Sequence, residues 1–533
     1  MKKPAEETGR IARSAGKVSA AVMCSRVLGL VREQVFAFLF GAGFAYDAFV
    51  VAFRVPNLLR DLFGEGALSA AFVTVFSDYD TNRGEKDTMR LAGNVLVFFT
   101  ILLSIITLLG IWQAENIVRL LVESEFEMAP GKVELTRLMT VIMFPFLILI
   151  SLSSVCMGIL NTRGHFFVPS VSSSFFNMGS IIGGVGLALS LPKFGYPAIV
   201  GMAVGTLFGG FLQLVCQFPS LRQAGFRFVP NLDLRDPGLR RVFRLMVPAV
   251  VGLAALQINV FINNFFASSL QEGSLSWLNY AFRLFMLPVG VFGVAVSIAA
   301  HPVMARQAAT GSLDSLRESY ASTLNMVFCL TVPAAVGLIV LAEPIIRVIF
   351  QYGRFDTFST MMTSQALVYY AAGLASYAAV KVTVPVFYNL DATRFPVVGS
   401  FLAVAVNIMV ILTAIDVLQH RALALSISCA MTANFLFLFI VLYRKLAGFS
   451  LGYLLKGLAK ILAAAVVMTG WLLMIDTVFG AKDASGNVLV DIFILMTSII
   501  SGAVVYGVAL YLTGLPELRM IVDKLRERFS GAD

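Results

Sequence analysis

Residues 18–40 read VSAAVMCSRVLGLVREQVFAFLF, a membrane-length apolar stretch with two arginines, Arg26 and Arg32, in its middle. An arginine at the centre of a bilayer costs about 2.5–3.5 kcal/mol on insertion scales, so its guanidinium has to face protein, water or an anion. The pattern recurs in later apolar stretches, at Arg54, Arg60 and Arg283. It favours a pathway or pocket for an anionic substrate; the alternative is that each arginine extends from near a helix end to the membrane surface.

The composition is that of a polytopic membrane protein. Hydrophobic residues make up 58% of the chain and charged residues 13%, whereas about 25% of the residues of a soluble domain are charged. The net charge of +9 is therefore interpreted loop by loop, and we expect no nucleic-acid partner. No small-residue cleavage site follows the first apolar stretch, which predicts a retained helix rather than a signal peptide.

Fourteen apolar segments are long enough for transmembrane helices, which need about 20 residues each. The expected spans are 18–40, 44–78, 92–113, 138–160, 166–190, 196–219, 241–268, 275–304, 320–345, 360–388, 395–415, 421–443, 456–478 and 489–513. The fold class is thus an all-α polytopic membrane protein.

Charges in the loops predict the orientation. Lysine and arginine gather in the N-terminal segment, after the second and sixth spans and in the C-terminal tail, which share one side when the number of spans is even. The loops of the other side are short or acidic: Glu115, Glu123, Glu125 and Glu127 follow the third span, and Glu272 follows the seventh. Because basic loops stay in the cytoplasm, both termini are expected there.

The chain repeats itself at an interval of six spans. Three short matches carry this inference, with offsets of 229, 228 and 231 residues: 52–54 with 281–283, Ser69 with Ser297, and 162–163 with 393–394. Because six is an even number of spans, both copies cross the membrane in the same direction, and the repeat is parallel. We expect its axis to lie along the membrane normal and a substrate site to lie between the halves. The predicted parts are an N-terminal lobe of helices 1–6 (1–220), a C-terminal lobe of helices 7–12 (221–445), and helices 13 and 14 with a cytoplasmic tail (446–533).

The second span carries the densest polar pattern. Asp47, Arg54 and Asp61 lie seven residues apart and therefore share one stripe of a helix. We expect Pro56 to kink the helix, because proline removes a backbone donor. A run of small residues around an acidic one allows bending further on: Gly64, Glu65 and Gly66. The pattern favours a polar cavity wall with a hinge; ion pairs that fix the packing, such as Asp47 with an arginine, are the alternative.

The first, eighth and tenth spans add further candidates. Ser25 and Arg32 share a face of the first span, and Gly29 could bend it so that its two arginines converge. By the repeat, the eighth span corresponds to the second; Ser276 and Arg283 share one broad face of it, and Pro288, Gly290 and Gly293 allow bending. Lys381 in the tenth span is another intramembrane cation that could lie in the same space as these arginines. Arginine forms paired hydrogen bonds with phosphate oxygens, so a phosphate or diphosphate is a better candidate anion than chloride.

Enzyme signatures are absent from the sequence. It contains no P-loop, no HExxH and no Gly-x-Ser-x-Gly, the motifs of phosphate binding, zinc proteolysis and serine hydrolysis. We therefore expect no enzymatic activity, no cofactor and no metal site. An integral-membrane phosphotransferase or glycosyltransferase would need an acidic cluster, and a scaffold for cell-wall enzymes would need no buried arginine.

One long block resembles a known family. Residues 25–73, SRVLGLVREQVFAFLFGAGFAYDAFVVAFRVPNLLRDLFGEGALSAAFV, are similar to the N-terminal signature of the MurJ (MviN) lipid II flippases, which belong to the multidrug/oligosaccharidyl-lipid/polysaccharide exporter superfamily. Shorter similar stretches are SWLNYAFRLFMLPVGVFGVA (276–295), FQYGRFD (350–356) and KVTVPVFYNLDATRFPV (381–397). The resemblance covers essentially the whole chain.

The resemblance implies a fourteen-helix protein of the bacterial inner membrane, with two six-helix lobes around a cationic cavity. Its substrate would be lipid II, the undecaprenyl-diphosphate-linked peptidoglycan precursor, moved to the periplasmic leaflet by alternating access. A flippase for another polyprenyl-diphosphate oligosaccharide, such as an O-antigen unit, stays open. Membrane lipids and cell-wall synthesis proteins are the other partners that it implies.

The resemblance also carries family roles onto residues. The cavity arginines match Arg26, Arg32, Arg60 and Arg283, and the polar partners of helices two and eight match Asp47 and Ser276. Phe282 departs from relatives that carry an acidic residue before the arginine. A sodium site described in some relatives would correspond to Asn263, Asn264 and Asn407, without an acidic residue in the middle of helix eleven, so sodium coupling is not expected.

Overall fold

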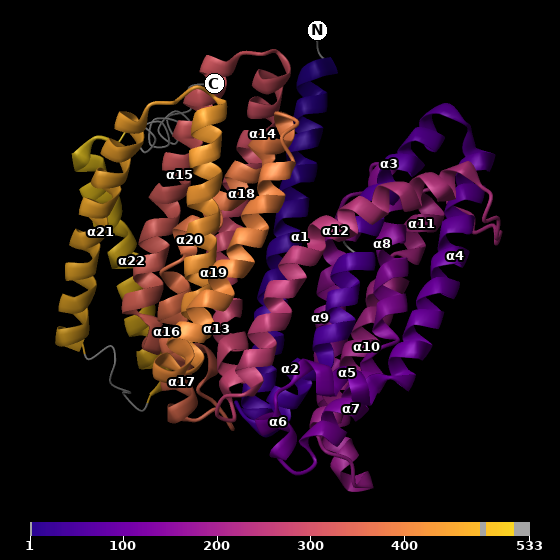
Figure 1. Ribbon diagram of the computed structural model, residues 1–533, viewed down its shortest axis with the longest axis horizontal. Helices are drawn as coiled ribbons and strands as arrows, with labels where there is room; N and C mark the ends of the chain where they lie inside the picture. The colour runs from indigo at the N-terminus through magenta and orange to yellow at the C-terminus, as the bar shows by residue number, and fades with distance from the viewer. Residues whose placement is uncertain (1–2, 65, 480–486, 516–533) are drawn as a thin grey trace. The chain divides into compact units, whose positions relative to one another are not determined.

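The computed structural model describes residues 3–64, 66–479 and 487–515. Within these ranges the chain forms helices and no β-strand (Figure 1). Each of the fourteen predicted spans coincides with one helix or with consecutive helices. The predicted fold class, an all-α polytopic membrane protein, is confirmed.

Two compact units make up the chain, and the first comprises Met1–Ser276. Its elements are α1 (Lys3–Phe40), α2 (Phe44–Leu59), the π-helical segment η1 (Arg60–Gly64), α3 (Ala67–Asn82), α4 (Glu85–Trp112), α5 (Ala114–Leu121), α6 (Ser124–Met128), α7 (Lys132–Met143), α8 (Phe146–Thr162), α9 (Phe167–Ser190), η2 (Leu191–Phe194), α10 (Ile199–Val215), α11 (Phe218–Gln223) and α12 (Pro237–Ser268). Its main apolar core joins α3, α4 and α8, and Val242 and Met246 of α12 pack into that core.

The second unit comprises Trp277–Asp533. Its elements are most of α13 (Ser274–Pro288), the π-helical segment η3 (Val289–Val294), α14 (Ala295–Ala309), α15 (Leu313–Val340), α16 (Ala342–Phe350), α17 (Thr357–Ala371), α18 (Leu374–Asn389), α19 (Arg394–Leu418), α20 (His420–Lys445), α21 (Leu451–Phe479) and α22 (Val488–Thr513). The last two helices lie side by side (Figure 1), and the Tyr506 hydroxyl of α22 donates to the carbonyl of Cys329 in α15 at 2.8 Å. The predicted division at residues 220 and 445 stays a prediction.

Judged by length and composition alone, ten described helices are long and apolar enough to cross a membrane. The number is eleven if α17 and α18, which are bent by 45°, form one span. The remaining predicted spans lie in α1, α2–α3 and α12. In α1 the apolar run is interrupted by three charged residues, Arg26, Arg32 and Glu33. In the second span, α2 is only 16 residues long because η1 follows it. The polar interruptions thus fall in the two spans that the sequence singles out for function.

Glycines bring α9 and α10 into close contact. A Cβ atom placed on Gly205 would lie 2.4 Å from the Cα of Gly184, a distance that no real side chain can occupy. Small residues let helix backbones approach where lipid supplies no hydrophobic force between helices. The close packing of α9 and α10 forms a pair whose first helix, α9, contacts α1.

The two π-helical segments occupy equivalent places in the repeat. The first, η1, begins at Arg60 and the second, η3, at Val289, an offset of 229 residues that equals the offset of the repeated tripeptide. A π-helical turn is rare, and it loosens the regular hydrogen-bond ladder, often at functional sites. The predicted hinge residues Gly64, Gly290 and Gly293 lie inside these segments, and Pro288 directly precedes η3.

The predicted kink at Pro56 is displaced along the chain. The α-helix continues past Pro56 to Leu59, and its geometry changes at Arg60. A proline loses one backbone hydrogen bond without ending a helix that packing holds on both sides. Gly66 directly precedes α3, and the predicted hinge residue Glu65 lies outside the described residues.

Candidate functional site

Arg32 of α1 is held beside a carboxylate. Its Nη2 donates to Oε1 of Glu33 at 3.0 Å, and Oε2 of Glu33 accepts a 2.6 Å hydrogen bond from the Tyr46 hydroxyl. The guanidinium carbon lies 5.3 Å from the centroid of the Phe176 ring. The Nε atom of Arg32 is buried and has no hydrogen-bond partner. Glu33 neutralises part of the charge of this arginine, and the Nε donor is left for a further acceptor.

Arg26 lies six residues before Arg32 on the same helix and is half-buried. No side chain in the described part of the chain forms an ion pair or hydrogen bond with it. The neighbouring Ser25 accepts a 3.1 Å hydrogen bond on its carbonyl from Nδ2 of Asn177 in α9. α1 is continuous through Gly29, where an added Cβ would lie 3.6 Å from Asn177, an ordinary contact. Ser25 and Arg32 thus both face α9.

Arg54 contacts α12 directly, and Arg60 pairs with Asp61, which itself contacts α12. Arg54 donates from Nε and Nη2 to Oδ1 of Asn264, both at 3.3 Å. Arg60, the first residue of η1, donates from Nη2 to Oδ1 of Asp61 at 2.8 Å, and Nε2 of Gln257 donates to the other Asp61 oxygen at 3.3 Å. Both arginines of the second span are thus bonded to nearby partners, an amide and a carboxylate, and the predicted cavity wall stays a prediction.

Asp47 lies at the centre of a fully buried network. Lys132 Nζ lies 3.3 Å from Oδ2, which also accepts from the backbone of Gly273 at 2.8 Å. The other oxygen, Oδ1, accepts from the backbone and the hydroxyl of Ser276 at 3.0 and 2.6 Å. The carboxylate therefore satisfies the free N–H groups at the start of α13 in the way that an N-cap residue does. The cation that pairs with Asp47 is Lys132 rather than an arginine.

Aromatic rings enclose Lys132. Its Nζ atom lies 4.5 Å from the ring centroid of Phe126 and 5.6 Å from that of Phe44. The side chains of Lys132 and Asp47 are only 4% and 2% exposed. A buried pair of this kind contributes little net stability, but removal of one partner leaves an uncompensated charge.

Residues related by the repeat meet at this network. Asp47 and Ser276 are 229 residues apart, and the backbone N–H of Phe44 donates at 3.0 Å to Glu272, 228 residues away. Both contacts lie within the first unit and join the start of α2 to the residues at and just before the start of α13.

The other predicted site residues belong to the second unit. Arg283 is exposed on α13. Lys381 is exposed on α18, with Nζ 5.5 Å from the ring centroid of Tyr377, and among the described residues no carboxylate pairs with it. That Arg283 and Lys381 share one space with the arginines of the first unit stays a prediction.

Three functional candidates were not singled out in the sequence: Glu33, Lys132 and Asn264. Glu33 had a signal, since it directly follows an arginine inside an apolar run. Lys132 had none, because it stands at the first position of a helix after an acidic loop and resembles a solvated charge. Asn264 has a signal only through the resemblance, as one of the residues that correspond to a sodium site of some relatives. Among the described residues, no group of three His, Cys, Asp or Glu side chains could hold a metal ion.

The sequence matches the model of the family described as lipid II flippase MurJ over residues 36–493. A probable lipid II flippase MurJ of Vibrio cholerae is 36% identical, covering 88% of this chain and 90% of the relative. A probable lipid II flippase MurJ of Buchnera aphidicola subsp. Acyrthosiphon pisum is 35% identical, covering 80% of this chain and 83% of the relative.

Solved structures share the fold. A structure described as a lipid II flippase MurJ in an inward closed conformation matches with a TM-score of 0.74 at 24% identity, covering 92% of this chain and 98% of that chain. An inward-facing multidrug resistance transporter of the MATE family and MOP superfamily matches with a TM-score of 0.69 at 16% identity, covering 81% and 98%.

Proposed function

The chain belongs to the lipid II flippase MurJ family, and we propose that it moves lipid II from the cytoplasmic to the periplasmic leaflet by alternating access. It is an integral membrane protein with a lipid substrate and a place in peptidoglycan biosynthesis. We place it in the bacterial inner membrane with both termini in the cytoplasm, on the distribution of basic loops. Cell-wall synthesis proteins that consume lipid II are the proposed partners.

One observation carries the proposal: an excess of positive charge on the apolar helices of the first unit. The charges of residues 18–64, together with Lys132, are five cations (Arg26, Arg32, Arg54, Arg60, Lys132) and three carboxylates (Glu33, Asp47, Asp61), so the sum is 5 − 3 = +2. Lys132 and Asp47 neutralise each other, so the whole excess belongs to the arginines. The diphosphate is the part of lipid II whose negative charge and oxygen acceptors match this excess of arginine charge.

The arginines can exchange one set of acceptors for another. Glu33 and Asp61 accept from Arg32 and Arg60, so these guanidinium groups are already partly withdrawn from water. Diphosphate oxygens that replace the carboxylates, or fill the free Nε of Arg32, form charge-assisted bonds at little extra desolvation cost. Return of the carboxylates would favour release. Transport requires such a difference in binding between two states.

The Asp47 network is the proposed latch of the periplasmic side. It joins the starts of α2, α7 and α13 through one carboxylate, and in the proposed orientation these starts face the periplasm. Opening to that side requires the bonds from Ser276 and Gly273 to break. The π-helical segments η1 and η3 are the proposed bending points, because each interrupts its helix on the side of the latch away from the periplasm.

No covalent bond changes in this cycle, so we propose no catalytic residue and no cofactor. The division into an N-terminal lobe, a C-terminal lobe and helices 13 and 14 is likewise proposed on the repeat. The substrate-binding set is Ser25, Arg26, Arg32, Asp47, Arg54, Arg60, Ser276, Arg283 and Lys381.

Complementation of a flippase-depleted bacterium, with a leaflet assay for lipid II, tests the function. The native chain should restore growth and periplasmic lipid II, Arg26→Gln should not, and the exposed loop variant Arg227→Gln should match the native chain. Growth without movement of lipid II, or movement of an O-antigen lipid alone, would contradict the substrate assignment.

A further inference from the structure

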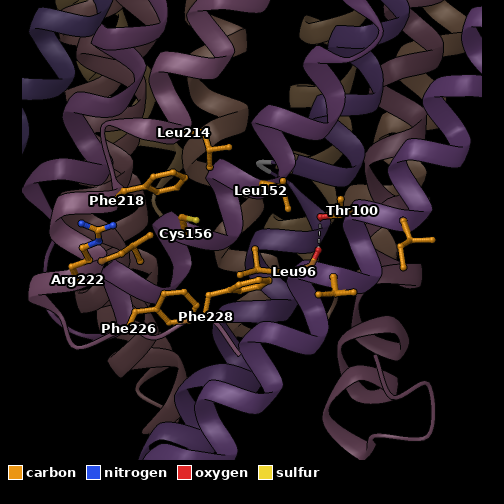
Figure 2. Close-up of a pocket in the computed structure, with 12 residues that line it drawn as sticks. Leu96, Thr100, Leu152, Cys156, Leu214, Phe218, Arg222, Phe226 and Phe228 are labelled. Atoms are coloured by element: carbon orange, nitrogen blue, oxygen red, sulfur yellow. Dashed lines mark hydrogen bonds between the residues drawn. The ribbon is translucent and has the colours of Figure 1, made fainter. Parts of the chain in front are cut away.

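A cavity of about 530 Å³ lies in the first unit, apart from the arginines of α1 and α2. Its walls come from three membrane helices, α4, α8 and α10, and from α11 with the segment after it. Figure 2 shows Leu96 and Thr100 of α4, Leu152 and Cys156 of α8, and Phe218, Phe226 and Phe228 of the other walls. The volume is within the range of about 300–1,000 Å³ typical of small-ligand sites.

The walls offer almost nothing polar. The Thr100 hydroxyl donates to the carbonyl of Leu96 at 2.7 Å, so its only donor is already used. Cys156 is buried with 4% of its surface exposed, and a thiol behaves as a small apolar group. The remaining lining, apart from one residue, is aliphatic or aromatic. An occupant of the interior must therefore be a hydrocarbon.

The exception is Arg222, which lies at one edge of the cavity (Figure 2). It is exposed, and within the described ranges no carboxylate forms an ion pair with it. The next arginine, Arg227, is exposed beyond the wall and is not part of the lining. One end of the site is thus cationic, in a loop that the charge pattern places in the cytoplasm, where anionic lipid head groups attract arginine.

From this geometry we propose that the cavity binds one acyl chain of an anionic phospholipid of the cytoplasmic leaflet, with Arg222 contacting its phosphate. An engineered cavity of about 150 Å³ holds the six carbons of benzene, so about 530 Å³ holds roughly 20 carbons. That is the size of one phospholipid chain and much less than a long polyprenyl tail. The bound chain would join α11 to α4 and α8 and leave the transport pathway free.

The open rim supports entry from the bilayer. Phe218 and Phe228 remain 44% and 55% exposed, and Ile101 of α4 is 44% exposed. Exposed aromatic and aliphatic side chains beside a cavity on membrane helices face lipid rather than water. A phospholipid can therefore enter laterally, with its head group held at the level of Arg222.

Photo-crosslinking of the full chain in vesicles of phosphatidylethanolamine and phosphatidylglycerol tests the site. The probe is phosphatidylglycerol with a diazirine at the end of one acyl chain, and the crosslinked peptides are mapped by mass spectrometry. We expect crosslinks within 96–101, 152–156 and 214–228. Arg222→Gln should lower the yield about fivefold, the effect of one interfacial arginine, whereas Arg222→Lys and the matched control Arg227→Gln should change it little.

Each other outcome contradicts part of the proposal. Crosslinks elsewhere would exclude the cavity as a phospholipid site. Equal yields from Arg222→Gln and Arg227→Gln, or from a diazirine phosphatidylcholine, would exclude recognition of an anionic head group. Loss of the crosslink on addition of a polyprenyl diphosphate would assign the cavity to the substrate's tail instead.

Discussion

The helical run α2–η1–α3 and its repeat counterpart α13–η3–α14 share a backbone plan but differ in charge. Both runs interrupt an α-helix with a π-helical segment, at positions 229 residues apart. The first run carries Asp47, Arg54, Arg60 and Asp61, whereas the equivalent positions 276, 283, 289 and 290 hold serine, arginine, valine and glycine. The π-helical interruption is thus present in both copies, whereas the ionisable groups are concentrated in the first copy.

The difference assigns separate roles to the two copies. An interruption at the same place in both suggests that both must bend in the same step. Because the first copy carries more charged residues, we infer that it supplies most of the anion-binding groups and the latch carboxylate, whereas the second supplies N–H and hydroxyl donors to that carboxylate. Substitutions of equivalent residues should therefore have unequal effects.

The largest inequality is expected at Asp47 and Ser276. Asp47→Ala leaves the ammonium of Lys132, whose side chain is 4% exposed, buried without its counter-charge. This should lower the free energy of unfolding by about 3–5 kcal/mol. Ser276→Ala removes one hydroxyl donor and should cost about 1–3 kcal/mol. Unfolding of the detergent-solubilised protein measures both.

A double variant provides the control for that comparison. Asp47→Ala combined with Lys132→Met removes the charge that Asp47→Ala strands, so it should recover most of the lost stability. If Asp47→Ala and Ser276→Ala lowered the free energy of unfolding equally, or if the double variant recovered none of it, the buried ion pair would not explain the difference between the two copies.

The next largest effect concerns the second π-helical segment. A Cβ on Gly293 would lie 2.9 Å from the Cβ of Ala378 in α18, so Gly293→Ala overpacks this contact and should cost about 1–3 kcal/mol of unfolding free energy. The matched control is Gly29→Ala in α1, where an added Cβ would make only an ordinary contact at 3.6 Å and alanine should stabilise the helix by about 0.5–1 kcal/mol.

If the π-helical segments bend during transport, Gly293→Ala should also slow lipid II movement in the leaflet assay, beyond any loss of folded protein. Normal transport by a stably folded Gly293→Ala protein would remove η3 from the mechanism and leave η1 as the only bending point.

The smallest stability effect is expected at the ion pair of η1. Arg60 and Asp61 are 25% and 33% exposed, so Asp61→Asn should change stability by less than about 1 kcal/mol. Because the variant frees the Arg60 guanidinium from its carboxylate, lipid II should bind more tightly and leave more slowly. The control is Asp78→Asn, which removes the surface partner of Arg241; an affinity gain of the same size there would mean a nonspecific charge effect.

Much of the fold could be predicted from the sequence because apolar length and repeat offset are local quantities. The fourteen spans, the equivalence of the second and eighth, and the polar stripe at 47, 54 and 61 needed no tertiary information. The latch did not follow, because Lys132 is distant in sequence and its burial depends on the rings of Phe44 and Phe126. The π-helical segments did not follow either, since proline and glycine indicate bending without its exact geometry.

The candidate site was predictable in its cations but not in their partners. Arg26, Arg32, Arg54 and Arg60 are conspicuous because a charge inside an apolar run is costly. Which acceptor each one meets depends on packing: Arg54 contacts Asn264, 210 residues away, whereas Arg60 contacts its own neighbour. Only the structure separates Arg32, which already pairs with Glu33, from Arg26, which pairs with nothing described.

The most direct test of the central claim, that the arginines of α1 and α2 bind the diphosphate of lipid II, is the affinity of lipid II for Arg26→Gln in nanodiscs. Arg26 can be changed without stranding a carboxylate, so folding should be unaffected. One charge-assisted hydrogen bond contributes about 1.5–3 kcal/mol, so we expect Arg26→Gln to bind lipid II at least about tenfold more weakly than the native chain. Arg26→Lys should recover part of the lost affinity, and Arg227→Gln should bind lipid II as tightly as the native chain. Native affinity in a folded Arg26→Gln protein would contradict the claim.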